Sequence, residues 1–130
     1  MIVTDASAVI DLVADIGRKS LLRDRLSGDR LLAPNFLPVE VASGLRGMNL
    51  GGKLADRDLR DAVGFLRLLR VDLHPSIPLI PRAMTLRHDF SAYDASYVAL
   101  AEAYGCPLLT YDKRLAKAAK KHCAIEVVSP

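Results

Sequence analysis

Four acidic residues stand at positions of the sequence where carboxylates can do chemistry together. Asp5 and Asp112 each lie at the end of a short apolar run, and Glu40 and Asp94 lie in the first two turns of helical patterns. Converging carboxylates repel one another, and burial adds to the cost unless a cation lies among them. Oxygen ligands without histidine or cysteine suit Mg²⁺ or Mn²⁺, which can activate water for phosphodiester hydrolysis. The four acids therefore predict metal-assisted hydrolysis of a phosphodiester.

Each acid also has a simpler interpretation. Aspartate is a favoured N-cap residue, and its charge suits the positive end of the helix dipole, which would explain Asp5, Asp94 and Asp112. Glu40 lies beside the apolar stripe of its helix, next to Ser43. Its alternative is a solvated position at the edge of an amphipathic face.

The elements that must position these acids alternate between short apolar runs and longer helical patterns. Strands are expected at Ile2–Asp5, Arg30–Ala33, Arg70–Leu73, Pro107–Tyr111 and Ile125–Val128. Helices are expected at Ser7–Ala14, Arg18–Leu26, Phe36–Asn49, Ala55–Leu69, Pro78–His88, Ala92–Tyr104 and Lys113–Lys121. This pattern predicts a three-layer α/β/α fold with a parallel sheet covered on both faces. Ligands of such sheets bind at the carboxyl ends of the strands.

Composition narrows the class of protein. The 130 residues are 51% hydrophobic and 25% charged, which fits one folded domain over residues 1–130 and excludes disorder. No uncharged run approaches the ~18 residues of a membrane span, and no basic residue marks the N-terminus as a signal peptide. Cys106 and Cys123 form no CxxC motif, so we expect no disulfide framework and a cytoplasmic protein. The net charge of +3 is compatible with a nucleic-acid partner.

Four segments around the acids resemble the motifs of one known family. They are Ile2–Val9, Pro38–Val41, Ser91–Ala95 and Leu109–Asp112. Their residues, order and spacing are similar to those of PIN-domain motifs, and the resemblance covers essentially the whole chain. Within that family, size and motifs are most similar to the VapC toxins of VapBC toxin–antitoxin pairs.

The resemblance implies a Mg²⁺- or Mn²⁺-dependent endoribonuclease with a five-stranded sheet of order 3-2-1-4-5. It implies that Asp5, Glu40, Asp94 and Asp112 are both the catalytic residues and the metal ligands. It also implies a homodimer that a VapB antitoxin inhibits. Ser7 and Thr110 match family hydroxyls that support the carboxylates, although turn and cap chemistry would also explain them.

Tyr97 departs from the pattern of some relatives, which carry another acid at that position, so occupancy of a second metal site stays open. Tyr93 and Tyr97 could stack on bases, but packing of the helix is the simpler role. A further candidate for RNA contact is a stripe of lysines, which could equally be a solvated face. The stripe consists of Lys113, Lys117, Lys120 and Lys121.

Other function classes are weighed against the ribonuclease. A phosphoryl-receiving signalling domain needs paired acids after the first strand and a lysine after the last, and the sequence offers neither. A PIN nuclease that is not a toxin, or a catalytically silent PIN-like module that binds RNA or protein, remains open.

Overall fold

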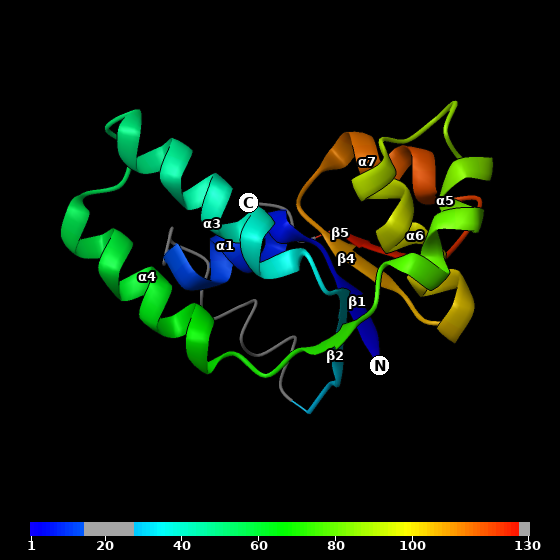
Figure 1. The fold of residues 1–130 in the computed structure, drawn as a ribbon, viewed down its shortest axis with the longest axis horizontal. Coiled ribbons are helices and arrows are strands. Elements are labelled where there is room, and N and C mark those ends of the chain that lie inside the picture. The colour runs from blue at the N-terminus through cyan, green and yellow to red at the C-terminus, as the bar shows by residue number, and fades with distance from the viewer. Residues whose placement is uncertain (15–27, 128–130) are drawn as a thin grey trace.

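The computed structural model describes residues 1–14 and 28–127 (Figure 1). The strands are β1 (Ile2–Thr4), β2 (Leu31–Pro34), β3 (Asp72–His74), β4 (Leu108–Thr110) and β5 (Ile125–Val127). The helices are α1 (Ala6–Ala14), α3 (Leu37–Leu50), α4 (Asp56–Leu68), α5 (Ile80–Thr85), α6 (Ala92–Tyr104) and α7 (Lys113–Ala119), with a 3₁₀ turn at Ile77–Leu79. The expected helix at Arg18–Leu26 lies outside the described residues.

The strands form one parallel sheet in the order β3-β2-β1-β4-β5. The predicted α/β class with a parallel sheet is therefore confirmed. β1 lies between β2 and β4, and its residues Ile2 and Val3 are fully buried. The chain leaves β1 toward β2 on one side and reaches β4 on the other, so the strand order reverses at β1. Such a switch point opens a crevice at the carboxyl ends of the strands.

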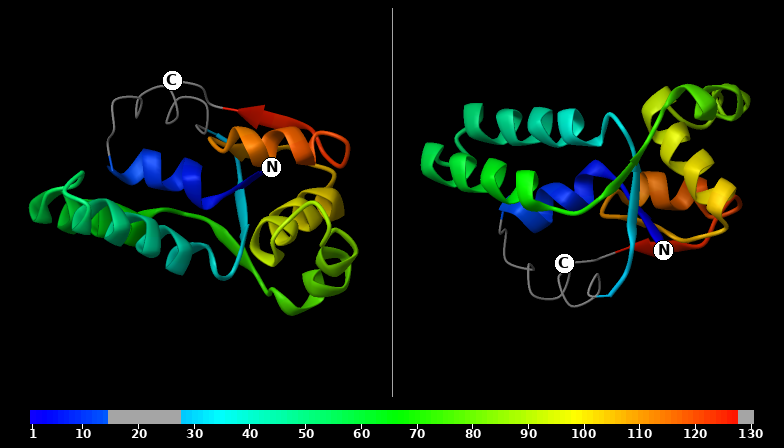
Figure 2. Two further views of the ribbon diagram at one scale, coloured as in Figure 1. Left: turned by 90° about the horizontal axis from the view of Figure 1, so that it is seen from above. Right: turned by 60° about the horizontal axis from the view of Figure 1, so that its bottom comes forward.

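Helices lie to both sides of the sheet (Figures 1 and 2). On one side α1, α3 and α4 pack against one another, and on the other α6 packs against α5 and against β1, β2 and β4. α7 packs on β4 and β5. No helix among the described residues is long and apolar enough to cross a membrane.

A glycine allows α3 to approach α1 closely. A Cβ built on Gly44 would lie only 2.3 Å from Cδ1 of Ile10 in α1, so any larger residue would force that side chain to move. The close approach matters for the site because α1 follows Asp5 directly and α3 carries Glu40. Gly44 therefore helps to set the separation of these two acids.

Three expected elements differ in their bounds by more than one residue. The segment expected as one helix over Pro78–His88 is a 3₁₀ turn followed by α5, each with a proline in its first turn, where its missing N–H costs least. The helix expected to reach Lys121 ends at Ala119, whose carbonyl accepts bonds from the two backbone N–H groups after Lys121. The third strand starts at Asp72 because the pairing with β2 sets its register.

Candidate active site

Asp5 lies directly after β1 and is almost completely buried, at 5% exposure. Its Oδ1 accepts bonds from the Ser7 hydroxyl at 2.7 Å and from the backbone N–H of Ala8 at 3.0 Å. Its Oδ2 accepts a short bond from the Thr110 hydroxyl. The bond to Ala8 caps α1, as the simpler interpretation expects, yet three donors on one buried carboxylate also fix its orientation.

The hydroxyls of Ser7 and Thr110 join the ends of β1 and β4. Besides bonding to Asp5, the Ser7 hydroxyl accepts a bond from the Tyr111 N–H at 3.0 Å, and Thr110 Oγ1 accepts one from the Asp112 N–H at 2.9 Å. The two hydroxyl oxygens are 3.3 Å apart. This small network holds the backbone of Asp112 in a set position relative to the carboxylate of Asp5.

Glu40 projects from the first turn of α3 and is half-buried. Its Oε1 accepts a 2.6 Å bond from the hydroxyl of Tyr97 in α6, whose side chain is only 1% exposed. Phe36, at the start of α3, packs edge-on against the Tyr97 ring with centroids 5.5 Å apart. Glu40 is thus a carboxylate with a fixed partner, rather than a freely solvated one.

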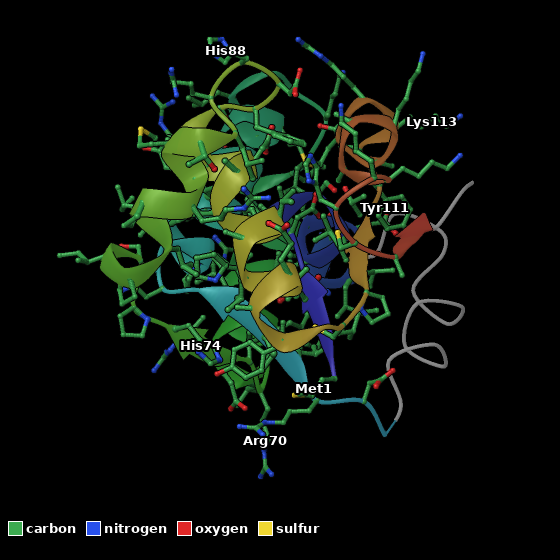
Figure 3. The ribbon with its side chains drawn as sticks, turned by 90° about the vertical axis from the view of Figure 1, so that its right-hand side faces the viewer. Met1, Arg70, His74, His88, Tyr111 and Lys113 are labelled. Atoms are coloured by element: carbon green, nitrogen blue, oxygen red, sulfur yellow. The ribbon has the colours of Figure 1, made fainter. Side chains whose placement is uncertain are left out.

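Asp94 and Asp112 differ in whether they cap a helix. The cap of α6 is Ser91, whose hydroxyl accepts the N–H of Asp94 at 3.1 Å, so the capping interpretation of Asp94 is wrong. Asp112 does cap α7, because its Oδ1 accepts the N–H groups of Arg114 and Leu115, both at 3.0 Å. In Figure 3 its chain neighbours Tyr111 and Lys113 lie at this end of α7.

Electrostatic coupling shows that the four acids converge. Burial raises the pKa of Asp5, of Glu40 and of Asp94 above their ordinary values. Mutual repulsion raises the same pKa values further: Asp112 acts on Asp5 and Asp94, while Glu40 is affected by both Asp94 and Asp5. Each acid is therefore coupled to at least two others, although they come from four separate elements.

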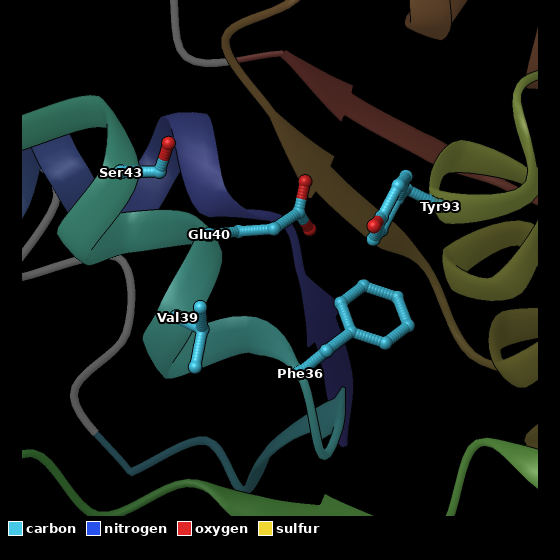
Figure 4. A pocket seen from close by; sticks show the side chains of 5 residues that line it. All are labelled: Phe36, Val39, Glu40, Ser43 and Tyr93. Atoms are coloured by element: carbon cyan, nitrogen blue, oxygen red, sulfur yellow. The ribbon is translucent and has the colours of Figure 1, made fainter. Parts of the chain in front are cut away.

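Two hollows flank the acids. A hollow of about 210 Å³ contains Asp94 and Asp112 together with Ser91 and Arg114. The Arg114 guanidinium opposes the rise in the pKa of Asp94. A larger hollow of about 520 Å³ lies beside Glu40 and is shown in Figure 4. Its lining residues are Phe36, Val39, Glu40, Ser43 and Tyr93.

The basic residues near the site differ from the expected lysine stripe. A surface hollow of about 380 Å³ is lined by Arg114, Lys117, Lys120 and Lys121, which we call the basic face. Arg114 and Ala118 line both this hollow and the one that contains Asp94 and Asp112, so the two adjoin. Lys113 is exposed but does not line the basic face, and Lys120 and Lys121 lie in the turn after α7.

Sequence reasoning missed three contributors to the site. Arg114 directly follows Lys113 but does not share the spacing of the lysine stripe, so the pattern of lysines does not indicate it. Phe36 could have been noticed because it lies four residues, about one helical turn, before Glu40. The pairing of Tyr97 with Glu40 spans 57 residues of sequence and has no local signal.

The chemistry of the donor set suits a hard divalent cation. All four side chains offer carboxylate oxygens, and burial and repulsion by the other acids already oppose the charge on Asp5, Glu40 and Asp94. Within residues 1–14 and 28–127, no three histidine, cysteine, aspartate or glutamate side chains are placed to hold an ion by themselves. Mg²⁺ usually keeps several waters and takes only one or two carboxylates directly, so the set fits an ion held partly through water.

Comparison with known proteins finds relatives that match almost the whole chain. The PIN domain model matches residues 2–121. A VapC ribonuclease of Mycobacterium bovis, Mb0985, is 41% identical over 128 residues, which cover 98% of each chain. Ribonuclease VapC1 of Mycobacterium tuberculosis is 40% identical over 97% of this chain and 96% of its own.

Solved structures show the same fold. The Mycobacterium tuberculosis toxin VapC20, which cleaves the sarcin-ricin loop, superposes with a TM-score of 0.66 at 20% identity, covering 91% of this chain and 95% of its own. PAE2754 from Pyrobaculum aerophilum gives a TM-score of 0.63 at 24% identity, covering 95% of this chain and 89% of its own. With a match over most of its length and relatives at about 40% identity, the chain belongs to the PIN-domain family and, within it, to the VapC ribonucleases.

Proposed function

We propose that this protein is a metal-dependent endoribonuclease and the toxin of a toxin–antitoxin pair. The observation that carries the proposal is the convergence of Asp5, Glu40, Asp94 and Asp112 from four separate elements at the carboxyl edge of the sheet. The names of its relatives, which are VapC ribonucleases, support the same activity. We assign the four carboxylates to binding of Mg²⁺ or Mn²⁺ and to catalysis.

Some residues would hold the metal, and others would position those ligands. Asp5 is held rigid by Ser7 and Thr110, and Tyr97 orients Glu40. Asp112 is fixed through its backbone by Thr110, and Asp94 faces it across the small hollow. Bound among these carboxylates, a divalent cation would activate a water and stabilise the charge on the phosphate oxygens. The supporting hydroxyls would keep the ligands in place while RNA enters.

We further propose the partners that the family relationship suggests. A VapB-type antitoxin would inhibit the enzyme, with an arginine that makes charge-assisted bonds to the carboxylates. The protein would act as a homodimer in the cytoplasm. The lysines Lys117, Lys120 and Lys121, with Arg114, would contact the RNA backbone from the basic face.

Incubation of the purified protein with RNA tests the proposal directly. Structured and unstructured RNAs are incubated with Mg²⁺, with Mn²⁺ or with EDTA, and the products are separated on denaturing gels. We expect internal cuts with either ion and none with EDTA. Absence of cleavage with both ions, together with retained RNA binding, would instead indicate the catalytically silent module.

Growth assays test the toxin role separately. Expression of the chain alone should slow growth, and co-expression with the neighbouring open reading frame should restore it. If the wild-type chain cleaves RNA in vitro but leaves growth unchanged, the protein is a PIN nuclease that is not a toxin.

A further inference from the structure

An aromatic corner, formed by Phe36 and Tyr93, borders the acidic residues at Glu40. Tyr93, one residue before Asp94, is 57% exposed. Its ring packs edge-on against Phe36 with centroids 5.2 Å apart and an interplanar angle of 87°. Phe36 in turn packs on the buried ring of Tyr97, so the corner rests on the core. Figure 4 shows the Phe36 and Tyr93 rings beside the Glu40 carboxylate.

The hollow beside the aromatic corner is lined by exposed apolar side chains. Val39, on the wall of the same hollow, is 72% exposed, so two exposed apolar side chains line this one hollow. Exposed apolar side chains that gather around one hollow mark contact sites more often than isolated ones do. The remaining lining residues, Glu40 and Ser43, have polar side chains. The hollow therefore combines an aromatic wall with a small polar edge.

The position of the hollow beside Glu40 indicates which part of an RNA it would bind. Glu40 belongs both to the acidic residues and to this hollow, so an RNA with a phosphate at the carboxylates would place an adjoining nucleoside here. A second phosphate would be repelled by the Glu40 carboxylate, whereas a nucleobase is flat and uncharged. Unpaired bases bind proteins by stacking on aromatic rings, with hydrogen bonds at their edges. The Ser43 hydroxyl can donate or accept such a bond.

We propose that Tyr93 and Phe36 form a stacking subsite for an unpaired nucleobase next to the scissile phosphate, and that this contact helps to select the bond that is cut. The inference rests on the proposed ribonuclease function and adds a specificity-determining contact to it. Tyr93 is the residue to test, because changing Phe36 would also disturb Tyr97 and, through it, Glu40.

The decisive variant is Tyr93→Leu, which keeps an apolar side chain but removes the ring. Tyr93→Phe keeps the ring and removes only the hydroxyl. Tyr104→Leu is the matched control, because Tyr104 is a 43% exposed tyrosine at the other end of the same helix. Steady-state cleavage of a single-stranded RNA pool of random sequence, followed by sequencing of the products, gives KM, kcat and the base preference at the cut.

We expect Tyr93→Leu to raise KM roughly 5- to 150-fold, the range for loss of one base–aromatic stack, with a smaller change in kcat. The preference for the base beside the cut should flatten. Tyr93→Phe and Tyr104→Leu should match the parent in both respects. An unchanged KM and cut-site preference in Tyr93→Leu would overturn the subsite while leaving the ribonuclease function intact.

A binding measurement separates this failure from failure of the function itself. In an Asp112→Asn background, short RNAs with a single 2-aminopurine at successive positions report stacking through quenching of fluorescence. One position should be quenched, and the quenching should disappear when Tyr93 is also changed to Leu. If no position is quenched, no base stacks in the hollow and the proposal is wrong. If Tyr93→Leu weakens only the binding of the neighbouring gene's product, the hollow receives a protein side chain and the proposal is also wrong. If the wild type cleaves no RNA with either ion, it is the ribonuclease function that fails.

Discussion

The acidic residues and the basic face lie next to each other on the surface but are built in opposite ways. Asp5 is buried and accepts three hydrogen bonds, and Glu40 has a fixed tyrosine partner. On the basic face, Arg114, Lys117 and Lys121 are exposed side chains around an open hollow. One region depends on the placement of individual atoms, and the other on the sum of several charges.

This difference indicates how each region should respond to change. A buried, hydrogen-bonded carboxylate loses its role when one atom is replaced, because a neighbouring group cannot take its place. Exposed cations act through a field that salt screens and that neighbouring cations share. We therefore expect changes in the acidic residues to act nearly all-or-none, and changes on the basic face to be graded and dependent on salt.

The largest effect is expected from neutralising single acids. Asp5→Asn, Glu40→Gln, Asp94→Asn and Asp112→Asn should each lower RNA cleavage by more than about a hundredfold, the upper end of what changes in supporting groups produce. Asparagine caps helices as well as aspartate does, so Asp5→Asn and Asp112→Asn should keep the fold, and Glu40 and Asp94 cap no helix. Circular dichroism can check all four variants. Asp61→Asn, an exposed acid on α4, is the matched control. Full activity in any two of the four variants would contradict the assignment.

Metal binding should stabilise the fold. A cation that binds the native state and not the unfolded chain adds about 2.7 kcal/mol at 100 times its dissociation constant. Thermal midpoints should therefore rise with Mn²⁺ or Mg²⁺ and fall back after EDTA, and the rise should be lost in Asp5→Asn. A midpoint that ignores both ions, with cleavage that persists in EDTA, would exclude the metal mechanism.

Removing the support of Glu40 should weaken metal binding without abolishing it. Tyr97→Phe deletes the hydroxyl that donates to Glu40 but keeps the ring that packs on Phe36. Loss of such a supporting bond typically costs about 10- to 100-fold in metal affinity, which calorimetric titration with Mn²⁺ measures. Tyr104→Phe, which changes an exposed tyrosine hydroxyl on the same helix, should leave the affinity unchanged. Equal affinities in both variants would mean that Glu40 needs no positioning.

The basic face should give a graded effect. The triple variant Lys117→Gln, Lys120→Gln and Lys121→Gln should weaken RNA binding and reduce the salt slope by up to about three units, with metal affinity unchanged. A charge-matched control neutralises three exposed arginines of α4, namely Arg57, Arg60 and Arg67. If the lysine variant binds RNA like the parent at every salt concentration, the RNA path runs elsewhere, past Arg46 and Lys53.

The smallest effect is the pH dependence of the metal-free fold. Because burial raises the pKa of Asp5 in the folded state, its protonation favours folding: the gain is complete below the ordinary pKa of 3.8 and is lost as pH rises through the higher folded pKa. In EDTA at neutral pH, Asp5→Asn should therefore be more stable than the parent. This advantage should shrink as the pH falls, as thermal midpoints across that range will show. A constant difference between the two proteins would contradict a raised pKa.

Much of this protein is determined by local sequence. Apolar runs separated by helical patterns indicated the α/β class and the parallel sheet, because strands buried on both faces need continuous apolar residues. The order of those elements also placed Asp5, after β1, and Asp112, before α7, at one edge, since parallel strands end on the same side. Residue types alone then suggested a hard cation, because oxygen ligands without histidine or cysteine suit Mg²⁺ or Mn²⁺.

Other features were decided only by tertiary packing. Tyr93 and Tyr97 lie one helical turn apart and have the same local pattern, yet one is 57% exposed and the other 1%. The difference arises because Phe36 and Glu40, both from α3, cover the second tyrosine and leave the first at the rim. The partner of Glu40 and the shared position of Arg114 between two hollows are likewise contacts between separate elements. Such contacts depend on how helices pack across the sheet, which no short stretch of sequence encodes by itself.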